Sequence, residues 1–365
     1  MTPARTVIDR VVVDALQVPA ELSGIGRVVQ AIGRELRELP DGLRLELRCT
    51  REARPLLEPA FAPETIVRTP LARSRPRWLR ILWQQLVAPT RDGRSTLLVC
   101  PGDQGPVRGR ARVLLVVNDV RRLVRPETSG VGERVFYRLL LPPAARHAAH
   151  LVAVSGFSAA ELRRAIPGTE PEIVAQRPAA PRTAGRSPDG SVLVVGALRP
   201  YKGAETVVEA LAQLREDERP LVRFAGSREP AADPVLARAE RLGVARSIEL
   251  LGWVDDERLG RLYDAATATV HPSLYEGYGL GLAESLGCGV PAIASDIPAH
   301  REVAAEAAVY FPPGDAAALA DALRRVLADA DLCERLAAGG SERARQLRAA
   351  VPGWREVILA AARPS

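Results

Sequence analysis

The sequence predicts an α/β protein made of two doubly wound domains that face each other across a cleft. The first observation is a regular alternation between short apolar runs, which are typical of buried strands, and amphipathic stretches with the period of a helix. The second is that this alternation fills both halves of the chain, on either side of a proline-rich stretch at 166–190. Strands that alternate with helices in this way pair into parallel sheets. The length of 365 residues also suits two domains.

Composition favours a folded protein that binds anions in a reducing compartment, which predicts a cytoplasmic location. Hydrophobic residues make up 47% of the chain and charged residues 26%, unlike a disordered chain. No apolar run reaches the roughly 18 residues that a membrane-spanning helix needs. The four cysteines lie far apart and the four histidines form no cluster, so no metal site is expected. The net charge of +6 favours phosphates or an anionic membrane surface, and no nucleic-acid motif accompanies it.

The first half predicts a parallel sheet with a ligand-binding edge. Its expected strands are 7–16, 43–49, 65–68, 97–100, 113–117 and 151–154. After the first strand, SGIGR leads into a helix at 23–36, where Gly24 and Gly26 either bring the backbone close to a phosphate or form a tight turn. Asn118 and Asp119 follow the fifth strand, at the edge where parallel sheets place their ligands.

A basic segment at 73–86, RSRPRWLRILWQQL, allows two interpretations. Arg73, Arg75, Arg77 and Arg80 alternate with two tryptophans, which suits a helix that lies on an anionic bilayer at the inner face of the membrane. The same pattern suits an ordinary helix of the first domain that buries one apolar face. The sequence leaves both interpretations open.

The second half repeats the alternation from residue 192 onward. Its expected strands are 192–195, 221–225, 248–251, 268–270, 290–294 and 308–311, and its expected helices are 205–214, 234–242, 256–265, 316–327, 332–349 and 354–361. The predicted domains are therefore 1–180 and 181–345, both Rossmann-like, followed by a C-terminal segment, 346–365, that packs back on the first domain.

Two cations stand in the loop after the strand at 192–195. This loop reads GALRPYKG and places Arg199 and Lys202 just before a helix. Two cations beside a helix N-terminus suit a diphosphate, and they stabilise the charge that builds on a departing nucleoside diphosphate. The alternative is a pair of solvated surface side chains.

A glycine-rich turn with two acids follows the strand at 268–270. Glu276 lies in the turn, and Glu284 lies about one turn into the helix that the turn opens. Glycines and unpaired helix N–H groups make an anion site, and the two carboxylates can accept hydrogen bonds from hydroxyl groups. Recognition of phosphate and hydroxyls together indicates a sugar nucleotide, although glycine-rich turns are common in α/β proteins.

With these motifs in place, residues 192–330 resemble the retaining, GT-B-fold glycosyltransferases of family GT4. The matching pieces, in the family's order, are VVGALRPYKGAETVVEAL, ELLGWVDDERLGRLYDAATATVHPSLYEGYGLGLAESLGCGVPAIASD, HREV, VYFPPGD and ALADALRRVL. The first half matches more loosely, through SGIGR, RILWQQ, the strand ending in NDV, and AVSGFSAAEL. The resemblance implies that the two domains close on a nucleotide-sugar donor and transfer its sugar to an acceptor hydroxyl, without a catalytic metal or a resident cofactor.

The resemblance also implies roles for individual residues. Arg199 and Lys202 would hold the donor's diphosphate, Glu276 would contact the transferred sugar, and Glu284 would bind the ribose hydroxyls. The other candidates for donor binding lie near the phosphates, the sugar and the base: Gly24, Gly26, Trp253, Val254, Gly277, Tyr278, Gly279, Leu280 and Gly281.

One departure from the family concerns the remaining candidate catalytic residues, Asn118 and Asp119. Many relatives have His-Asp there, with the histidine beside the transferred sugar, whereas asparagine cannot act as an acid or base near neutral pH. This implies an altered donor or acceptor geometry, a mechanism in which the departing phosphate takes the acceptor's proton, or a catalytically silent subunit that binds nucleotide sugar or a partner. The first half resembles members that use GDP-mannose or deoxysugar nucleotides. The sequence does not identify the acceptor, and a saccharide, a lipid-linked saccharide and a small molecule all stay open.

Overall fold

The computed structural model describes residues 7–20, 24–74, 76–174, 185–227 and 232–363. The chain divides into two compact units. Residues 1–176 together with 351–365 form the first unit, and residues 177–350 form the second. The boundaries expected from the sequence, after residues 180 and 345, lie a few residues from these divisions.

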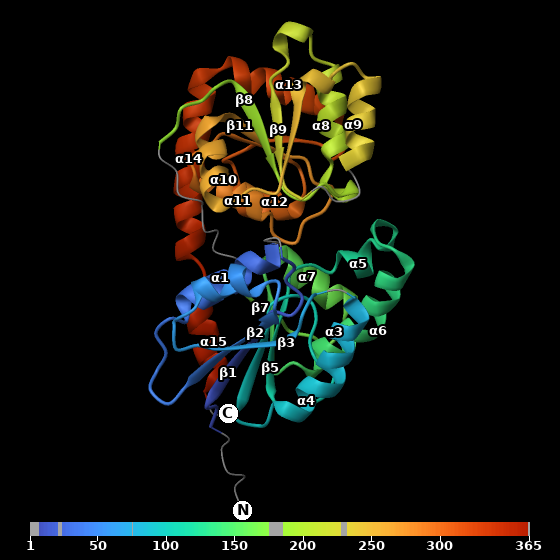
Figure 1. Ribbon diagram of the computed structural model, residues 1–365. Helices are drawn as coiled ribbons and strands as arrows, with labels where there is room; N and C mark the ends of the chain where they lie inside the picture. The colour runs from blue at the N-terminus through green and yellow to red at the C-terminus, as the bar shows by residue number, and fades with distance from the viewer. Residues whose placement is uncertain (1–6, 21–23, 75, 175–184, 228–231, 364–365) are drawn as a thin grey trace, which may run out of the picture. The chain divides into compact units, whose positions relative to one another are not determined.

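The first unit is built on a parallel sheet whose seven strands, over the described residues, follow the order β3-β2-β1-β4-β5-β6-β7 (Figure 1). The strands are β1 (Arg10–Asp14), β2 (Arg44–Thr50), β3 (Ile66–Leu71), β4 (Thr96–Cys100), β5 (Arg112–Val117), β6 (His150–Ala153) and β7 (Glu172–Ile173). The helices are α1 (Gly24–Glu35), α2 (Arg54–Leu57), α3 (Arg77–Leu82), α4 (Ala88–Arg91), α5 (Arg121–Val124), α6 (Val131–His147), α7 (Gly156–Ala165) and α15 (Trp354–Ala362). Val12, Leu98 and Leu115 point from the sheet into a core that also holds Tyr137 of α6 and Leu162 of α7.

The C-terminal helix α15 completes the first unit. Its Trp354 and Ile358 side chains are 2% and 0% exposed, and the helix packs against α1 and β4. The Arg112 guanidinium donates hydrogen bonds to the carbonyl oxygens of Ala361, at 3.1 Å, and Arg363, at 2.5 Å. The helix is therefore held by a buried tryptophan at its start and by a side chain of β5 at its end.

The second unit is built on a parallel sheet whose strands, over the described residues, follow the order β10-β9-β8-β11-β12-β13. The strands are β8 (Ser191–Val195), β9 (Val222–Ala225), β10 (Ile248–Gly252), β11 (Ala266–His271), β12 (Ala292–Ser295) and β13 (Val309–Phe311). The helices are α8 (Ala204–Ala212), α9 (Ala232–Arg241), α10 (Asp256–Ala265), α11 (Leu280–Gly287), α12 (Pro298–Ala304), α13 (Ala316–Ala328) and α14 (Ala330–Ala349).

Helices cover both faces of this second sheet, as successive residues of β8 show. Val192 and Val194 enter the core formed with α8, α9 and α13, whereas Leu193 enters the core that holds Tyr263 of α10. Figure 1 shows α8 and α9 on one side of the strands and α10 and α11 on the other. Because side chains alternate between the two faces of a strand, the continuous apolar run of β8 serves both cores.

Each sheet has one point where the direction of winding reverses. In the second unit β9 and β10 lie on one side of β8, and β11 to β13 lie on the other. In the first unit β2 and β3 lie on one side of β1, and β4 to β7 on the other. Open α/β sheets bind their ligands at such points, at the carboxyl ends of the strands. The loops that follow β8 and β11 are therefore where a site is expected in the second unit.

Of the two interpretations of the segment at 73–86, the one in which it buries an apolar face is wrong. The segment consists of α3, a π-helical turn at Trp83–Val87 (η2) and then α4, and it turns its polar side chains inward. Gln84 is 2% exposed and donates a hydrogen bond to Asp14, and Arg80 is 5% exposed and donates to Gln104. The reason is that this part of the sheet carries a buried carboxylate, which needs hydrogen-bond partners. Within the described residues, no helix is both long and apolar enough to span a membrane.

Candidate functional site

The loops after β8 and β11 meet at the switch point of the second sheet. The backbone N–H of Leu274 donates a hydrogen bond to the carbonyl oxygen of Tyr201 at 2.8 Å. Gly203 adopts φ +71, and a Cβ at this position would lie only 2.1 Å from the carbonyl oxygen of Pro272. A side chain is therefore excluded at residue 203 by both backbone conformation and space. The sequence places glycine where the two loops come closest.

The two loops are joined by an ion pair between Lys202 and Glu276. The Lys202 Nζ lies 2.6 Å from Glu276 Oε1, and the Ser273 hydroxyl donates to the same carboxylate oxygen at 2.7 Å. Both charged side chains are partly covered, at 27% and 17% exposed. Burial raises the pKa of Glu276, but Lys202, then His300 and the hydrogen bonds, lower it to a net value below that of an ordinary glutamate. The carboxylate is therefore ionised at neutral pH and acts only as a hydrogen-bond acceptor.

Lys202 is distinctive in the composition of the chain as well. Of the 50 lysines and arginines, the printed sequence shows Lys202 to be the one lysine, and all others are arginines. Lysine presents a compact point charge, whereas arginine presents a planar fork. The one lysine side chain of this arginine-rich chain lies at the sheet's switch point. Its rarity indicates a functional position more strongly than the local motif does.

The glycine-rich turn leads directly into α11. Gly279 adopts φ +101 and stands at the N-cap of this helix, where no side chain caps the first turn. A Cβ on Gly279 would lie 3.1 Å from the His300 ring, so the turn packs against that histidine. Gly277 and Tyr278 are buried, and Leu280 and Gly281 begin the helix, half-buried. The uncapped N–H groups and the helix dipole make this turn suited to an anion.

Glu284 lies one turn further along α11 and is buried. Its side chain is only 3% exposed, and the Tyr263 hydroxyl lies 3.5 Å from its Oε2. The position expected from the sequence, one turn into the helix, is therefore observed. Because the Glu284 carboxylate is buried, it can contact only the part of a ligand that lies deepest in the site.

The remaining candidates of the second unit line the same edge of the sheet. Arg199 is half-buried in the loop after β8, three residues before Lys202. Trp253 and Val254 follow β10, two strands away from β8 in the sheet. Trp253 is 41% exposed and Val254 is buried. The candidates that the structure brings into direct contact are therefore Lys202 and Glu276, while Arg199, Trp253 and Val254 share their edge.

The candidates of the first unit belong to the corresponding edge of its own sheet. Gly24 and Gly26 begin α1, and Asn118 and Asp119 follow β5. The side-chain Nδ2 of Asn118 donates hydrogen bonds to the carbonyl oxygen of Pro101, at 3.1 Å, and to Asp103, at 3.4 Å. The Asn118 amide is therefore oriented by the loop that follows β4.

Asp103 is a residue of this edge that carries no sequence signal. It adopts φ +50, is 5% exposed, and its Oδ1 accepts the backbone N–H of Asn118 at 2.6 Å. Burial, followed by repulsion from Asp119, raises the pKa of Asp103 to about 7, although Arg122 acts in the opposite direction.

The sequence likewise assigns no role to His300 and Ser273 of the second unit. His300 stands in the quoted HREV motif, which was the only available signal for it.

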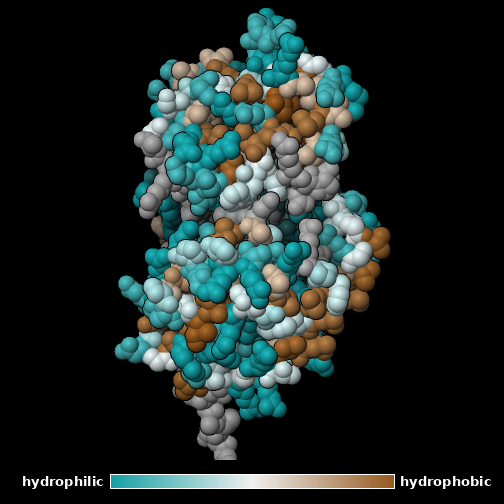
Figure 2. All heavy atoms as spheres, in the orientation of Figure 1, coloured by the Kyte–Doolittle hydropathy of each residue, from teal (hydrophilic) through white to brown (hydrophobic). Residues whose placement is uncertain are grey.

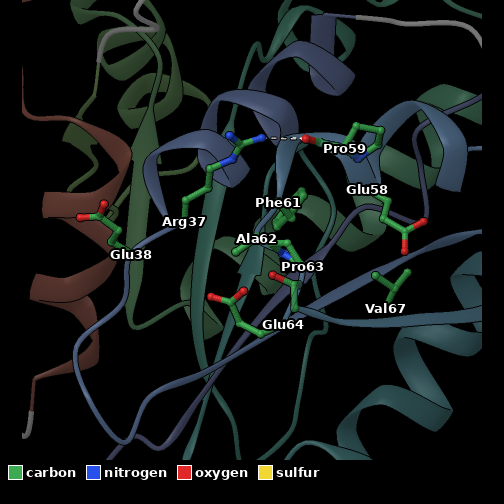
Figure 3. Close-up of a pocket in the computed structure, with 10 residues that line it drawn as sticks. Arg37, Glu38, Glu58, Pro59, Phe61, Ala62, Pro63, Glu64 and Val67 are labelled. Carbon is green, nitrogen blue, oxygen red and sulfur yellow. Dashed lines mark hydrogen bonds between the residues drawn. The ribbon is translucent and has the colours of Figure 1, made fainter.

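Figure 3 shows a pocket of about 600 Å³ in the first unit that is separate from these residues. It is lined by Arg37 and Glu38 beyond the end of α1, by Phe61, and by Glu64 and Val67 near the start of β3. The end of α1 and the start of β3 lie at the edge where the parallel strands begin. This pocket therefore lies at the edge of the sheet opposite to Asn118.

The two Rossmann-like units, with candidate residues at the carboxyl edge of each sheet, define the GT-B fold. Solved structures similar over the whole chain agree. One is sucrose-phosphate synthase from Thermosynechococcus elongatus, with a TM-score of 0.70 and 19% identity over 96% of this chain and 97% of that one. Another is the Anabaena protein HepE in complex with UDP-glucose, with a TM-score of 0.70 and 18% identity over 96% of this chain and 98% of that one.

Sequence comparison places the second unit in a family. Residues 180–343 match the family described as Glycosyl transferases group 1. The chain is similar to an O-antigen chain mannosyltransferase B of Escherichia coli, 33% identical over 43% of this chain and 42% of the relative. It is also similar to a phosphatidyl-myo-inositol mannosyltransferase of Mycobacterium leprae, 34% identical over 46% of this chain and 45% of the relative. The second unit therefore resembles the group 1 glycosyltransferases of the GT4 type. The match spans less than half of each of these two relatives.

Proposed function

We propose that this protein is a retaining glycosyltransferase that moves a sugar from a nucleotide-sugar donor to an acceptor hydroxyl, in the synthesis of a glycan, a glycolipid or a glycosylated natural product. The observation that carries the proposal is the contact of Lys202 with Glu276 across the two loops at the switch point of the second sheet. A cation for phosphate and a carboxylate for hydroxyl groups stand side by side there. This one pair can therefore bind both the diphosphate and the sugar of a sugar nucleotide.

The donor's diphosphate would lie between the cations and the start of α11. Arg199 and Lys202 supply positive charge, and the uncapped N–H groups after Gly279 supply donors. As the bond between the anomeric carbon and the phosphate oxygen breaks, negative charge builds on the diphosphate. Groups that bind the diphosphate more strongly in the transition state than in the ground state accelerate this step without a metal.

The two carboxylates divide the rest of the donor between them. Glu276, ionised at neutral pH, accepts hydrogen bonds from hydroxyls of the transferred sugar, and the buried Glu284 accepts them from the ribose. Trp253 and Val254, further along the edge, border the base. The backbone from Gly277 to Gly281 lies between these groups and holds sugar and phosphate oxygens.

The acceptor's proton would go to the departing phosphate. Asn118 offers hydrogen bonds but no acid or base at neutral pH, so it orients a hydroxyl and does not deprotonate it. The glycosidic bond then forms on the face from which the diphosphate leaves, and the proton passes to the leaving phosphate oxygen. Gly24 and Gly26 of the first unit would approach the same phosphates.

Two of the similar proteins are named mannosyltransferases, which supports GDP-mannose as the first donor to test. The HepE structure holds UDP-glucose, so UDP-sugars belong in the same panel. Acceptors to test are a saccharide, a lipid-linked saccharide and a small-molecule alcohol. We expect release of nucleoside diphosphate with one donor, and a product of retained anomeric configuration by NMR.

The residues are tested by variants of the ion pair. Glu276→Gln and Lys202→Ala should each lower turnover by at least about a hundredfold, because they remove interactions that act on the transition state. The matched control is Glu249→Gln, which removes the exposed Arg223–Glu249 pair of the same unit and should leave turnover unchanged. Normal turnover by both site variants would refute the assignment.

A second candidate function follows from Asn118, whose amide is held by Pro101 and Asp103 in place of a titrating side chain. It is a catalytically silent subunit that binds nucleotide sugar. Because Lys202 is the one lysine, an amine-selective reagent modifies only this side chain and the α-amino group. Protection of Lys202 by a nucleoside diphosphate, without turnover of any donor, would assign the silent role.

A further inference from the structure

We propose that the first unit docks on an anionic lipid bilayer through an apolar surface formed by α3, η2 and α6. This proposal goes beyond the proposed reaction and does not depend on it. The apolar docking surface consists of Trp78, Leu79, Leu82, Leu86, Val131, Val135 and Leu139, whose exposed fractions range from 41% to 71%. Figure 2 shows hydrophobic side chains gathered on the side of the first unit where Figure 1 places α3 and α6.

These seven residues are clustered, unlike the single hydrophobic side chains that are scattered over most protein surfaces. They are more than half of the 13 large hydrophobic side chains that are exposed within the described residues. Single exposed hydrophobics are normal on a folded protein, but a contiguous group marks an interaction surface. Two short segments of the chain carry this group.

In the first segment, α3 and η2, the fold itself directs the apolar side chains outward. In α3 and η2 the inner positions are taken by Arg80 and Gln84, both buried and hydrogen-bonded to polar groups of the sheet edge. Trp78 and Leu82 are left on the outer side, 60% and 46% exposed. A helix that buries its polar side chains and exposes its apolar ones is built to face something less polar than water.

The second segment, α6, contributes a stripe of the same kind. Val131, Val135 and Leu139 recur every four residues and therefore lie on one face of the helix. They are 71%, 50% and 66% exposed, whereas Tyr137 and Leu141 on the inner face are 3% and 2% exposed. The helix thus has a buried apolar face and a second, outward apolar stripe that the fold itself does not need.

The two segments are neighbours in the folded unit. The Arg80 guanidinium of α3 donates a hydrogen bond to Gln104 at 2.9 Å, and Tyr137 of α6 is hydrogen-bonded to the same side chain. Their inner faces therefore meet at Gln104, and Figure 1 shows α3 and α6 on the same side of the first unit. Residues some fifty positions apart in sequence form one surface.

Charge identifies the partner as an anionic bilayer. Among the described residues between 73 and 146, Glu127 is the one exposed acid, whereas the exposed arginines are Arg73, Arg91, Arg94, Arg108, Arg110, Arg125, Arg138 and Arg146. Tryptophan and leucine that enter the acyl boundary, flanked by arginines at the level of the headgroups, are the composition of interfacial membrane segments. An anionic lipid surface satisfies both parts of this pattern.

The test is flotation of the full-length protein with vesicles of phosphatidylcholine alone or mixed with phosphatidylglycerol. We expect binding to the mixed vesicles, at least tenfold weaker binding to phosphatidylcholine, and loss of binding at about 1 M salt because charge attraction is screened. Leu82→Glu and Leu139→Glu, each at an exposed position, should weaken binding at least tenfold. The matched control is Leu221→Glu in the second unit, also exposed, which should bind as the parent does.

Two results would overturn the proposal. One is equal or absent flotation with both kinds of vesicle, with circular dichroism showing the protein folded. The other is a dimer by sedimentation that Leu139→Glu dissociates, because this would assign the apolar docking surface to a second copy of the chain.

Discussion

At the scale of single residues, two glycines with similar backbone angles separate the effect of conformation from that of space. Gly203 has φ +71 and an added Cβ would clash with Pro272, whereas Gly243 has φ +68 and an added Cβ would meet nothing within 4 Å. Gly243→Ala should cost about 1 kcal/mol of unfolding free energy, which is the strain of a left-handed alanine. Gly203→Ala should cost about 3 kcal/mol or more, because the Pro272 carbonyl must also move. Urea denaturation of both variants measures this, and equal losses would contradict it.

The Lys202–Glu276 pair makes a prediction about pH. With Lys202 present, the lowered pKa of Glu276 contributes stability above the ordinary glutamate pKa, and this contribution is lost as the pH falls. In Lys202→Met, the lysine no longer lowers the pKa of Glu276, so burial raises this pKa. The ionised Glu276 carboxylate then destabilises the fold at neutral pH. The variant should therefore be less stable than the parent at pH 7, and the difference should shrink near pH 4. A difference in unfolding free energy that does not change with pH would count against this account.

At the scale of elements, the prediction concerns α15 and contrasts two tryptophans of the same unit. Trp354 is 2% exposed in the contact of α15 with the first unit, and Trp78 is 60% exposed on α3. Trp354→Ala should lower the unfolding free energy by about 3–5 kcal/mol, because it leaves a large cavity. Trp78→Ala should change it by no more than about 0.5 kcal/mol. Equal effects in thermal denaturation would show that α15 does not stabilise the first unit.

Elements also show what the sequence could and could not reveal. The strand, loop and helix order of the second unit followed from periodicity, because β8 is a continuous apolar run, β11 contains the apolar stretch 268–270, and both strands end in marked loops. The orientation of α3 could not be predicted. It depends on Asp14, a buried carboxylate in a distant strand that needs Gln84 as its partner. Asp103 escaped notice for a related reason, since one acid in a loop has no period and its position comes from Asn118 and Val116.

At the scale of the whole molecule, the two units have separate cores. The clustered core of the second unit uses residues from 192 to 336, and the corresponding cluster of the first uses residues from 12 to 166. Leu211→Ala, at a position with 0% exposure, should destabilise the second unit by about 2–5 kcal/mol. Hydrogen exchange should then accelerate in β8 and β9 and stay unchanged in β4 and β5. Equal acceleration in both sheets would mean that the chain unfolds as one cooperative body.

The return of α15 to the first unit has a consequence for biosynthesis. Domains usually fold in the order in which the ribosome releases them. Here the unit that is translated first lacks Trp354 and Ile358 until the residues after 350 have been made. The unit translated second, from 177 to 350, has all its residues earlier. On the ribosome, the later-encoded half can thus reach its native state while the earlier-encoded half still waits for its last helix.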